Sequence, residues 1–183
     1  MSDSFKPVFE GVHEALKTGE APALATFAVD SRQVSGLRSE VAARDFTYVV
    51  DEPPELGGSD QGPNPVEYIL GGLAACQEIT YRLYADKLGI PLDGVSVKVK
   101  GDIDLRGFFA VDDAVRAGFQ NVTVEVEFDS TASDTKLQEL KKAVDAHCPV
   151  LDILRNATPT ELFWGRGAKD AASPEEAATA AAE

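Results

Sequence analysis

The sequence predicts one globular domain in which antiparallel strands combine with helices. Two segments, residues 95–105 and 122–128, alternate apolar with polar residues, which is the period-two pattern of a half-buried strand. Residues 64–88 carry the start and stop signals of one long helix. The 183 residues are enough to bury a substantial core, yet the length is near that of one domain. We expect an amino-terminal helical extension (1–20), a main domain (21–166) and a disordered, acidic, Ala-rich tail (167–183).

The first part of the chain predicts a helix, a hairpin and a loop. Apolar residues recur at spacings of three and four within residues 5–16, which indicates an amphipathic helix. Residues 21–50 are rich in β-branched and aromatic residues around a turn near Ser35 and Gly36, so we expect an antiparallel hairpin there. Residues 51–64 hold three prolines and three glycines, which predicts a loop.

The long helix that follows has well-marked ends. Asn64 suits the N-cap, Pro65 suits the first helical position, and Glu67 stands where it closes a capping box. The first half of the helix is apolar nearly all round, so we expect burial on every side. Gly71 and Gly72 cost about 1 kcal/mol each relative to alanine inside a helix, which predicts that another element packs tightly against them.

The remaining elements are predicted to be a two-stranded sheet, two helices and a last strand. The two alternating segments should pair in one sheet. Ser133 or Asp134 then begins a helix with one apolar face, and this helix ends close to His147. A short helix follows at residues 149–154, and residues 160–165 have the composition of a strand.

Charge and hydropathy exclude several classes of function. Seventeen Lys and Arg residues against 31 Asp and Glu residues give a formal net charge of −14, which repels nucleic-acid phosphates and anionic membrane surfaces. No segment approaches the roughly 20 apolar residues that span a bilayer. The amino terminus lacks the basic patch and apolar run of a secretory signal, so we expect a cytoplasmic protein that binds neither nucleic acid nor membrane.

The two cysteines each admit a structural and a functional interpretation. Cys76 lies in the long helix, where a free cysteine commonly serves as a small buried hydrophobe. Cys148 precedes Pro149 at the start of a short helix, where backbone N–H groups and the positive dipole end favour a thiolate; alternatively it is a loop cysteine without function. His147 either lends positive charge to Cys148 or points to solvent.

Together the cysteines suit a reactive and a resolving thiol if the fold brings them together, which their spacing does not reveal. A zinc site is the competing interpretation. Cys76, His147 and Cys148 supply three candidate ligands without the spacing typical of such sites, so we expect no metal.

Two motifs connect the chain to a family. GPNPVEYILGGLAAC, which ends at Cys76, and AHCPV, around Cys148, resemble the two cysteine motifs of the OsmC/Ohr family of thiol-dependent peroxidases. The resemblance covers about residues 21–164. It implies an α+β fold, the OsmC-like fold, in which two chains form an intertwined homodimer. In that fold, curved antiparallel sheets surround the central cysteine-bearing helices.

The resemblance also implies a reaction. Cys76 would attack a hydroperoxide and become a sulfenic acid, Cys148 would condense with it to a disulfide, and an external dithiol would reduce that disulfide. Organic hydroperoxides would be preferred over hydrogen peroxide because the family's pocket at the dimer interface is apolar. Candidate lining residues are Tyr68, Phe108 and Phe109. The family implies no metal and no organic cofactor.

One position departs from the family's pattern. Val66 stands where the well-studied peroxidases carry an acid that helps to position an arginine over the thiolate. Glu67 comes one residue later, about 100° further round the helix, so it either closes the capping box with Asn64 or takes a displaced catalytic role. Arg38 and Arg44 are both candidates for the arginine.

This departure leaves a second function open. The alternative to a peroxidase is an OsmC-like scaffold that binds an apolar small molecule at its dimer interface without efficient peroxidase activity. Without a cation nearby, a cysteine in an apolar helix has a raised pKa and reacts slowly.

Overall fold

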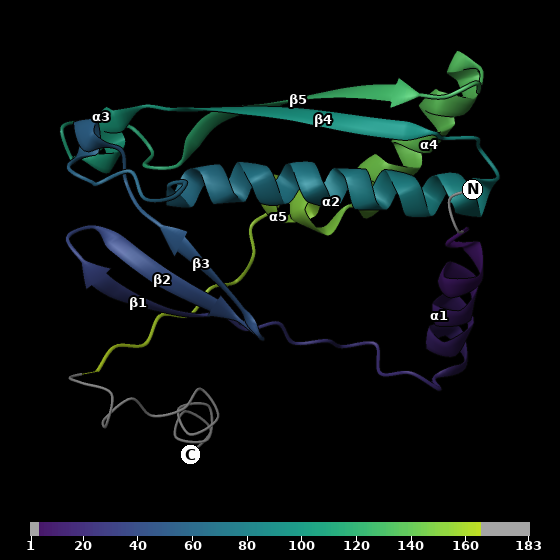
Figure 1. The fold of residues 1–183 in the computed structure, drawn as a ribbon, viewed down its shortest axis with the longest axis horizontal. Coiled ribbons are helices and arrows are strands. Elements are labelled where there is room, and N and C mark those ends of the chain that lie inside the picture. Colours follow the sequence, from purple (N-terminus) through teal and green to yellow (C-terminus); the bar gives the residue numbers. More distant parts are fainter. Residues whose placement is uncertain (1–3, 166–183) are drawn as a thin grey trace.

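A computed structural model describes residues 4–165, in which a long helix runs between two small antiparallel sheets (Figure 1). In chain order the elements are α1 (Lys6–Thr18), β1 (Asp30–Ser35), β2 (Arg38–Ala43), β3 (Phe46–Val50), the 3-10 turn η1 (Pro54–Leu56), α2 (Pro65–Leu88), β4 (Gly94–Ile103), α3 (Leu105–Phe108), β5 (Phe119–Asp129), α4 (Asp134–His147) and α5 (Pro149–Arg155). The tail predicted at residues 167–183 lies outside the described residues.

Helix α2 begins and ends where the sequence predicts. The Asn64 side chain accepts a hydrogen bond from the Glu67 backbone N–H at 2.9 Å, and the Glu67 carboxylate accepts one from the Asn64 backbone N–H at 2.8 Å. The capping box is therefore closed. Gly89 ends the helix at φ +64°, a left-handed conformation that glycine adopts without a Cβ clash. These two ends fix the position of Cys76 in the middle of the helix.

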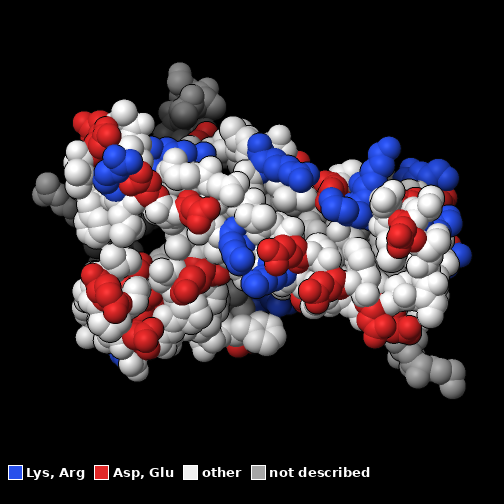
Figure 2. Space-filling view, turned by 90° about the horizontal axis from the view of Figure 1, so that it is seen from above, with Lys and Arg blue, Asp and Glu red and all other residues white. Residues whose placement is uncertain are grey.

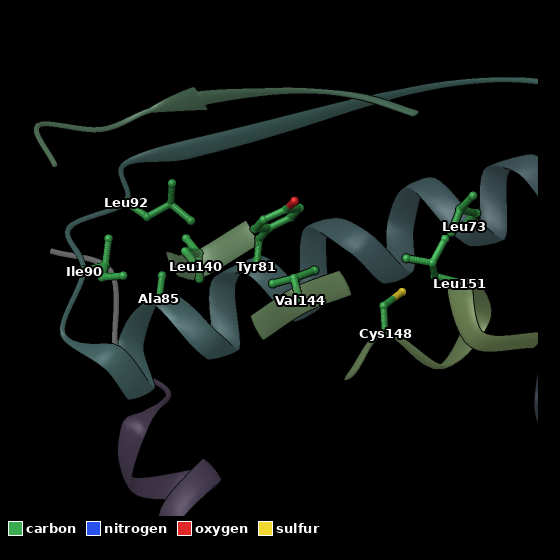
Figure 3. Close-up of a cluster of buried hydrophobic side chains, with 9 residues drawn as sticks. All are labelled: Leu73, Tyr81, Ala85, Ile90, Leu92, Leu140, Val144, Cys148 and Leu151. Atoms are coloured by element: carbon green, nitrogen blue, oxygen red, sulfur yellow. The ribbon is translucent and has the colours of Figure 1, made fainter. Parts of the chain in front are cut away.

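Strands β4 and β5 pair antiparallel, as predicted, and their alternating apolar face is half-buried against the core. The register runs from Gly94 opposite Asp129 to Ile103 opposite Phe119. The core lies between this sheet, α2 and α4, and its buried members are Leu73, Tyr81, Ala85, Ile90, Leu92, Leu140, Val144, Cys148 and Leu151 (Figure 3). Because Cys148 belongs to this cluster, core packing positions its thiol.

The predicted hairpin at residues 21–50 is a three-stranded meander, ordered β1-β2-β3. Its second predicted strand is broken by a tight turn at Arg44, which has a φ of +56°, and β1 begins only at Asp30. Strand-forming residues lie on both sides of this two-residue turn, so composition alone conceals it. Similarly, Leu105 begins α3 rather than extending β4.

Burial of α2 on every side, expected from its apolar sequence, is wrong for the single chain. Sheet β4–β5 and α4 cover the face that carries Leu73 and Tyr81. The opposite face is open: Ile79 is 61% exposed, and no other element comes within 4 Å of a Cβ placed at Gly71 or Gly72. The tight packing expected at the two glycines is therefore absent within one described chain.

The last predicted strand, at residues 160–165, is also not formed. This segment pairs with no strand among the described residues, and Leu162 and Trp164 are 90% and 88% exposed. A strand needs a neighbour for its backbone hydrogen bonds, and the single chain offers none at this place.

Charged side chains of both signs intermingle on the face seen in Figure 2. Within residues 4–165, no helix is long and apolar enough to cross a membrane.

Candidate active site

The fold brings the two cysteines together. The Sγ atoms of Cys76 and Cys148 lie 3.4 Å apart, and both are free thiols. Cys148 is 1% exposed, whereas Cys76 is partly accessible. Because disulfide sulfurs lie about 2.0 Å apart, a small side-chain movement is enough to join these two. Figure 3 shows the Cys148 side chain reaching from the α4–α5 junction toward α2.

The α4–α5 junction is built around Cys148. Its backbone N–H donates to the Val144 carbonyl at 2.9 Å, which completes α4, and its own carbonyl accepts from the Asp152 N–H at 3.0 Å in the first turn of α5. Pro149 occupies the first position of α5, as predicted, where its missing N–H costs no hydrogen bond. The chain can therefore turn at Cys148 without losing helical hydrogen bonding.

Opposing influences act on the Cys76 thiol. Burial raises its pKa above the ordinary value, and the neighbouring Cys148 raises it further. The Val150 backbone N–H and the nearby Thr80 hydroxyl act in the opposite direction and lower the pKa, because donors beside the sulfur stabilise a thiolate. The net direction is upward, so Cys76 rests as a thiol in the single chain.

Sequence reasoning missed these two hydrogen-bonding groups. Thr80 lies four residues after Cys76, on the same helix face, and donates from its hydroxyl to the Cys76 carbonyl at 2.6 Å. The i,i+4 spacing from Cys76 could have predicted this contact from the sequence. Val150 had no signal in the sequence, because its N–H reaches Cys76 only through the docking of α5 against α2.

Tyr81 is the other polar group beside the cysteines. It is fully buried, its ring packs edge-on against Phe128 at 5.0 Å, and burial raises the pKa of its hydroxyl to about 12, with Asp145 and Cys148 adding to the effect. Tyr81 is therefore neutral at physiological pH.

Of the two candidate arginines, neither affects the pKa of Cys76 within the single chain. Arg44 occupies the β2–β3 turn, with its guanidinium 5.2 Å from the centroid of the Phe46 ring. Arg38 begins β2, and its Nε is buried without a hydrogen-bond partner among residues 4–165.

Glu67 and His147 both have structural contacts. Glu67 closes the capping box described above, which is the first of its two expected roles. The His147 ring stacks on Tyr84 at 5.1 Å, and its Nδ1 lies 2.7 Å from the Ala143 carbonyl oxygen. Tyr84 in turn packs edge-on against Phe9 of α1, at 5.4 Å.

The three candidate lining residues have other contacts in the single chain. Tyr68 donates from its hydroxyl to the Val49 carbonyl at 2.7 Å and so connects α2 to strand β3 of the three-stranded sheet. Phe108 and Phe109 pack edge-on at 5.0 Å and are 62% and 56% exposed. None of the three lines the cleft of about 600 Å³ between α2, β5, α4 and α5, called here the α2–β5 cleft.

Metal ligands do not cluster in the described part of the chain. Within residues 4–165, no group of three or more His, Cys, Asp or Glu side chains is arranged to hold a metal ion.

Comparisons with known proteins agree with this architecture. A family model described as OsmC-like protein matches residues 58–163. An OsmC-like protein from Mycoplasma pneumoniae superposes with a TM-score of 0.61 at 20% identity, covering 72% of this chain and 88% of that one. No curated protein matches the chain significantly.

Two further solved structures have names that mention organic hydroperoxides. The organic hydroperoxide resistance protein OsmC from Legionella pneumophila has a TM-score of 0.58 at 23% identity, over 73% of this chain and 92% of that chain. An organic hydroperoxide resistance protein from Elizabethkingia anophelis has a TM-score of 0.57 at 20% identity, over 74% and 91%. At these identities the likeness establishes the shared fold.

Proposed function

This chain belongs to the OsmC-like protein family, and on that basis we propose that it reduces organic hydroperoxides by cycling Cys76 and Cys148 between thiols and a disulfide. The observation that carries the proposal is the 3.4 Å separation of the two sulfurs, which come from different helices. Two structural relatives, from Legionella and Elizabethkingia, are named for organic hydroperoxide resistance.

In the proposed reaction, Cys76 reacts first because it is the more accessible thiol. Its thiolate sulfur bonds to one peroxide oxygen while the O–O bond breaks, and the alcohol leaves after taking up a proton. The product on the protein is a Cys76 sulfenic acid. Cys148 sulfur then attacks the Cys76 sulfur, water leaves, and the disulfide forms. An external cytoplasmic dithiol supplies the two electrons and two protons that restore both thiols.

The active unit is proposed to be an intertwined homodimer with the cysteine-bearing helices at its centre. The open face of α2, with Gly71 and Gly72 uncovered, supports this, because small residues allow a second helix to approach closely. Several large apolar side chains are also exposed in the single chain, including Phe27 at 93% and Trp164 at 88%. A partner chain that covers these side chains would remove their apolar surface from water.

A partner chain would also complete the thiol site. We propose that Arg38 of the second chain lies near Cys76 and lowers the pKa of its thiol. The buried, unpartnered Nε of Arg38 supports this choice over Arg44, which already stacks on Phe46. The exposed Phe108 and Phe109 would line the apolar peroxide pocket, with Tyr68 beside the small sheet.

Substitution of the two arginines distinguishes them. In the dimer, Arg38→Gln should slow peroxide-driven loss of thiols at least about tenfold, because removal of a nearby cation raises the pKa of a thiol. Arg44→Gln is the matched control and should react like the unsubstituted protein. Equal rates for all three proteins would show that Arg38 does not act on Cys76.

The alternative function, a scaffold that binds an apolar small molecule, has two observations in its favour. Burial raises the pKa of Cys76, and Glu67 is engaged in the capping box rather than at the thiol. Such a protein would keep both thiols reduced in the presence of peroxide and would copurify with its ligand.

The decisive experiment counts free thiols and measures intact mass after brief exposure to cumene hydroperoxide or hydrogen peroxide. The peroxidase should lose two thiols and about 2 Da per chain, faster with the organic peroxide. Cys148→Ser should instead stop at a Cys76 sulfenic acid, about 16 Da heavier. Full activity in Cys76→Ser, or persistence of the thiols in the unsubstituted protein, would reject the proposal.

A further inference from the structure

The α2–β5 cleft has an apolar interior that opens on the surface of a single chain. Its walls come from the inner face of β5 and from α2 and α5, and include Leu73, Val122, Val124, Val126, Leu151 and Leu154. A volume of about 600 Å³ falls within the range of small-molecule sites. The cleft lies on the face of α2 that packs toward the β4–β5 sheet. This face is opposite the open face that is proposed above as the dimer interface.

Two exposed arginines line the cleft. Arg116 and Arg155 both line it and are exposed, and neither forms a salt bridge with any residue in the range 4–165. The acidic lining residue, Asp145, is already paired with Lys141 at 2.5 Å. Both guanidinium groups are therefore free to pair with a bound anion, although the chain as a whole carries a net charge of −14. They match an anionic group by charge and by their forked donor geometry.

Hydrogen-bonding groups without partners lie at the inner end. Gln77 is 2% exposed and Tyr81 is fully buried, and both line the cleft. Gln77 Nε2 and Tyr81 Oη have no hydrogen-bond partner among the described residues. Buried polar atoms are nearly always hydrogen-bonded in folded proteins. An acceptor oxygen on a bound molecule would satisfy these two groups after a small side-chain adjustment.

From these three features we propose that the α2–β5 cleft binds a medium-chain organic acid that carries a second oxygen at the far end of its chain. The carboxylate pairs with Arg116 and Arg155, and the alkyl chain packs along β5. The distal oxygen accepts hydrogen bonds from Gln77 and Tyr81. This site lies within one chain, on the face of α2 opposite the proposed dimer interface, and its Tyr81 end lies close to Cys148.

Isothermal titration calorimetry on the reduced, full-length dimer tests the proposal with four probes of equal chain length. We expect ω-hydroxydecanoate to bind most tightly and decanoate more weakly, and decylammonium should not bind. Decyl phosphate distinguishes a carboxylate site from a general anion site, and tighter binding of decyl phosphate than of decanoate would overturn the assignment to a carboxylate. Absence of binding by every probe, or equal binding of decylammonium, would overturn the proposal as a whole.

Substitutions locate the two ends of the site. The double variant Arg116→Gln, Arg155→Gln should lose at least about tenfold in affinity for both acids, whereas Arg32→Gln, an exposed arginine paired with Glu40, should bind normally. Tyr81→Phe should remove the advantage of ω-hydroxydecanoate and leave decanoate unchanged. Unaltered affinity in the double variant would reject the assignment. Cys76→Ser should bind both acids fully, so this outcome is independent of peroxidase activity.

Discussion

Reactivity at Cys76 depends on a small number of neighbouring atoms. Burial and Cys148 raise the pKa of its thiol, while the Thr80 hydroxyl and the Val150 N–H lower it. Both groups are donors, and a hydrogen bond to sulfur strengthens when the sulfur becomes an anion. The Thr80 hydroxyl donates to the Cys76 carbonyl in this structure and can rotate toward the sulfur when the thiolate forms. Thr80 is the one of the two that a side-chain substitution can remove.

Substitution of Thr80 by valine should therefore raise the pKa of the Cys76 thiol further, and at neutral pH the thiolate fraction should fall. We expect alkylation of Cys76 by iodoacetamide to slow about threefold, when measured against pH in a Cys148→Ser background. Thr80→Ser keeps the hydroxyl and should react normally; a slow Thr80→Ser protein would contradict this explanation.

At the scale of elements, the start of α2 determines how Glu67 should be interpreted. Its carboxylate and the Asn64 side chain each accept one of the unpaired N–H groups at the helix end. A carboxylate in this role needs its oxygen atoms more than its charge.

Glu67→Gln should therefore retain both stability and peroxidase activity, since glutamine also closes a capping box. Glu67→Ala should lose about 1 kcal/mol of unfolding free energy, measured by urea denaturation. Loss of activity in Glu67→Gln with normal stability would instead assign the charge to catalysis.

The loop before α2 is organised by another carboxylate. Asp51 is 1% exposed and accepts hydrogen bonds from the Ser59 hydroxyl and from the backbone N–H groups of Glu52, Ser59 and Gln61. The Ser59 hydroxyl contributes most to lowering the pKa of Asp51, while burial opposes it. These bonds form the loop that leads into the cap of α2.

A lowered folded-state pKa makes this loop sensitive to acid. The stabilisation is present above the unfolded-state pKa near 3.8 and is lost as pH falls through the folded-state value. Asp51→Asn should melt several degrees lower at pH 7, and its melting temperature should fall less steeply below pH 4. Calorimetric melting from pH 7 to pH 2 measures both effects. Parallel curves for the two proteins would show that Asp51 does not titrate with folding.

At the scale of the whole molecule, one chain leaves its longest helix half covered. The uncovered face contains Gly71 and Gly72, where a larger side chain would meet no atom of another element in the same chain. Each glycine lowers helix stability by about 1 kcal/mol relative to alanine, which is explained if the face packs closely against a second copy.

Gly72→Leu therefore separates folding from association. We expect the variant to keep its helical circular dichroism but to dissociate into monomers in analytical ultracentrifugation, because the leucine side chain holds the two helices apart. Gly11→Leu, on the exposed side of α1, is the matched control and should stay dimeric. A dimeric Gly72→Leu protein would place the interface elsewhere.

The sequence alone predicted those elements whose signals lie within a few neighbouring residues. The capping box and terminal glycine set α2 to within a residue, and strict alternation set the β4–β5 pair. Both signals depend on contacts between near neighbours in the chain, so pattern alone contains them. The turn at Arg44 was not predicted, because the residues on both sides of it have the composition of one continuous strand.

Tertiary structure alone decided which side chains meet. Cys76 and Cys148 approach because α4 and α5 pack on one face of α2, and the same packing directs Val150 toward the thiol. The apolar sequence of α2 predicted burial on all sides, yet the other elements of one chain cover only one face of this helix. The hydrophobic effect favours burial of apolar surface but has no preferred direction. Only the packed fold therefore determines which element covers each face of a helix.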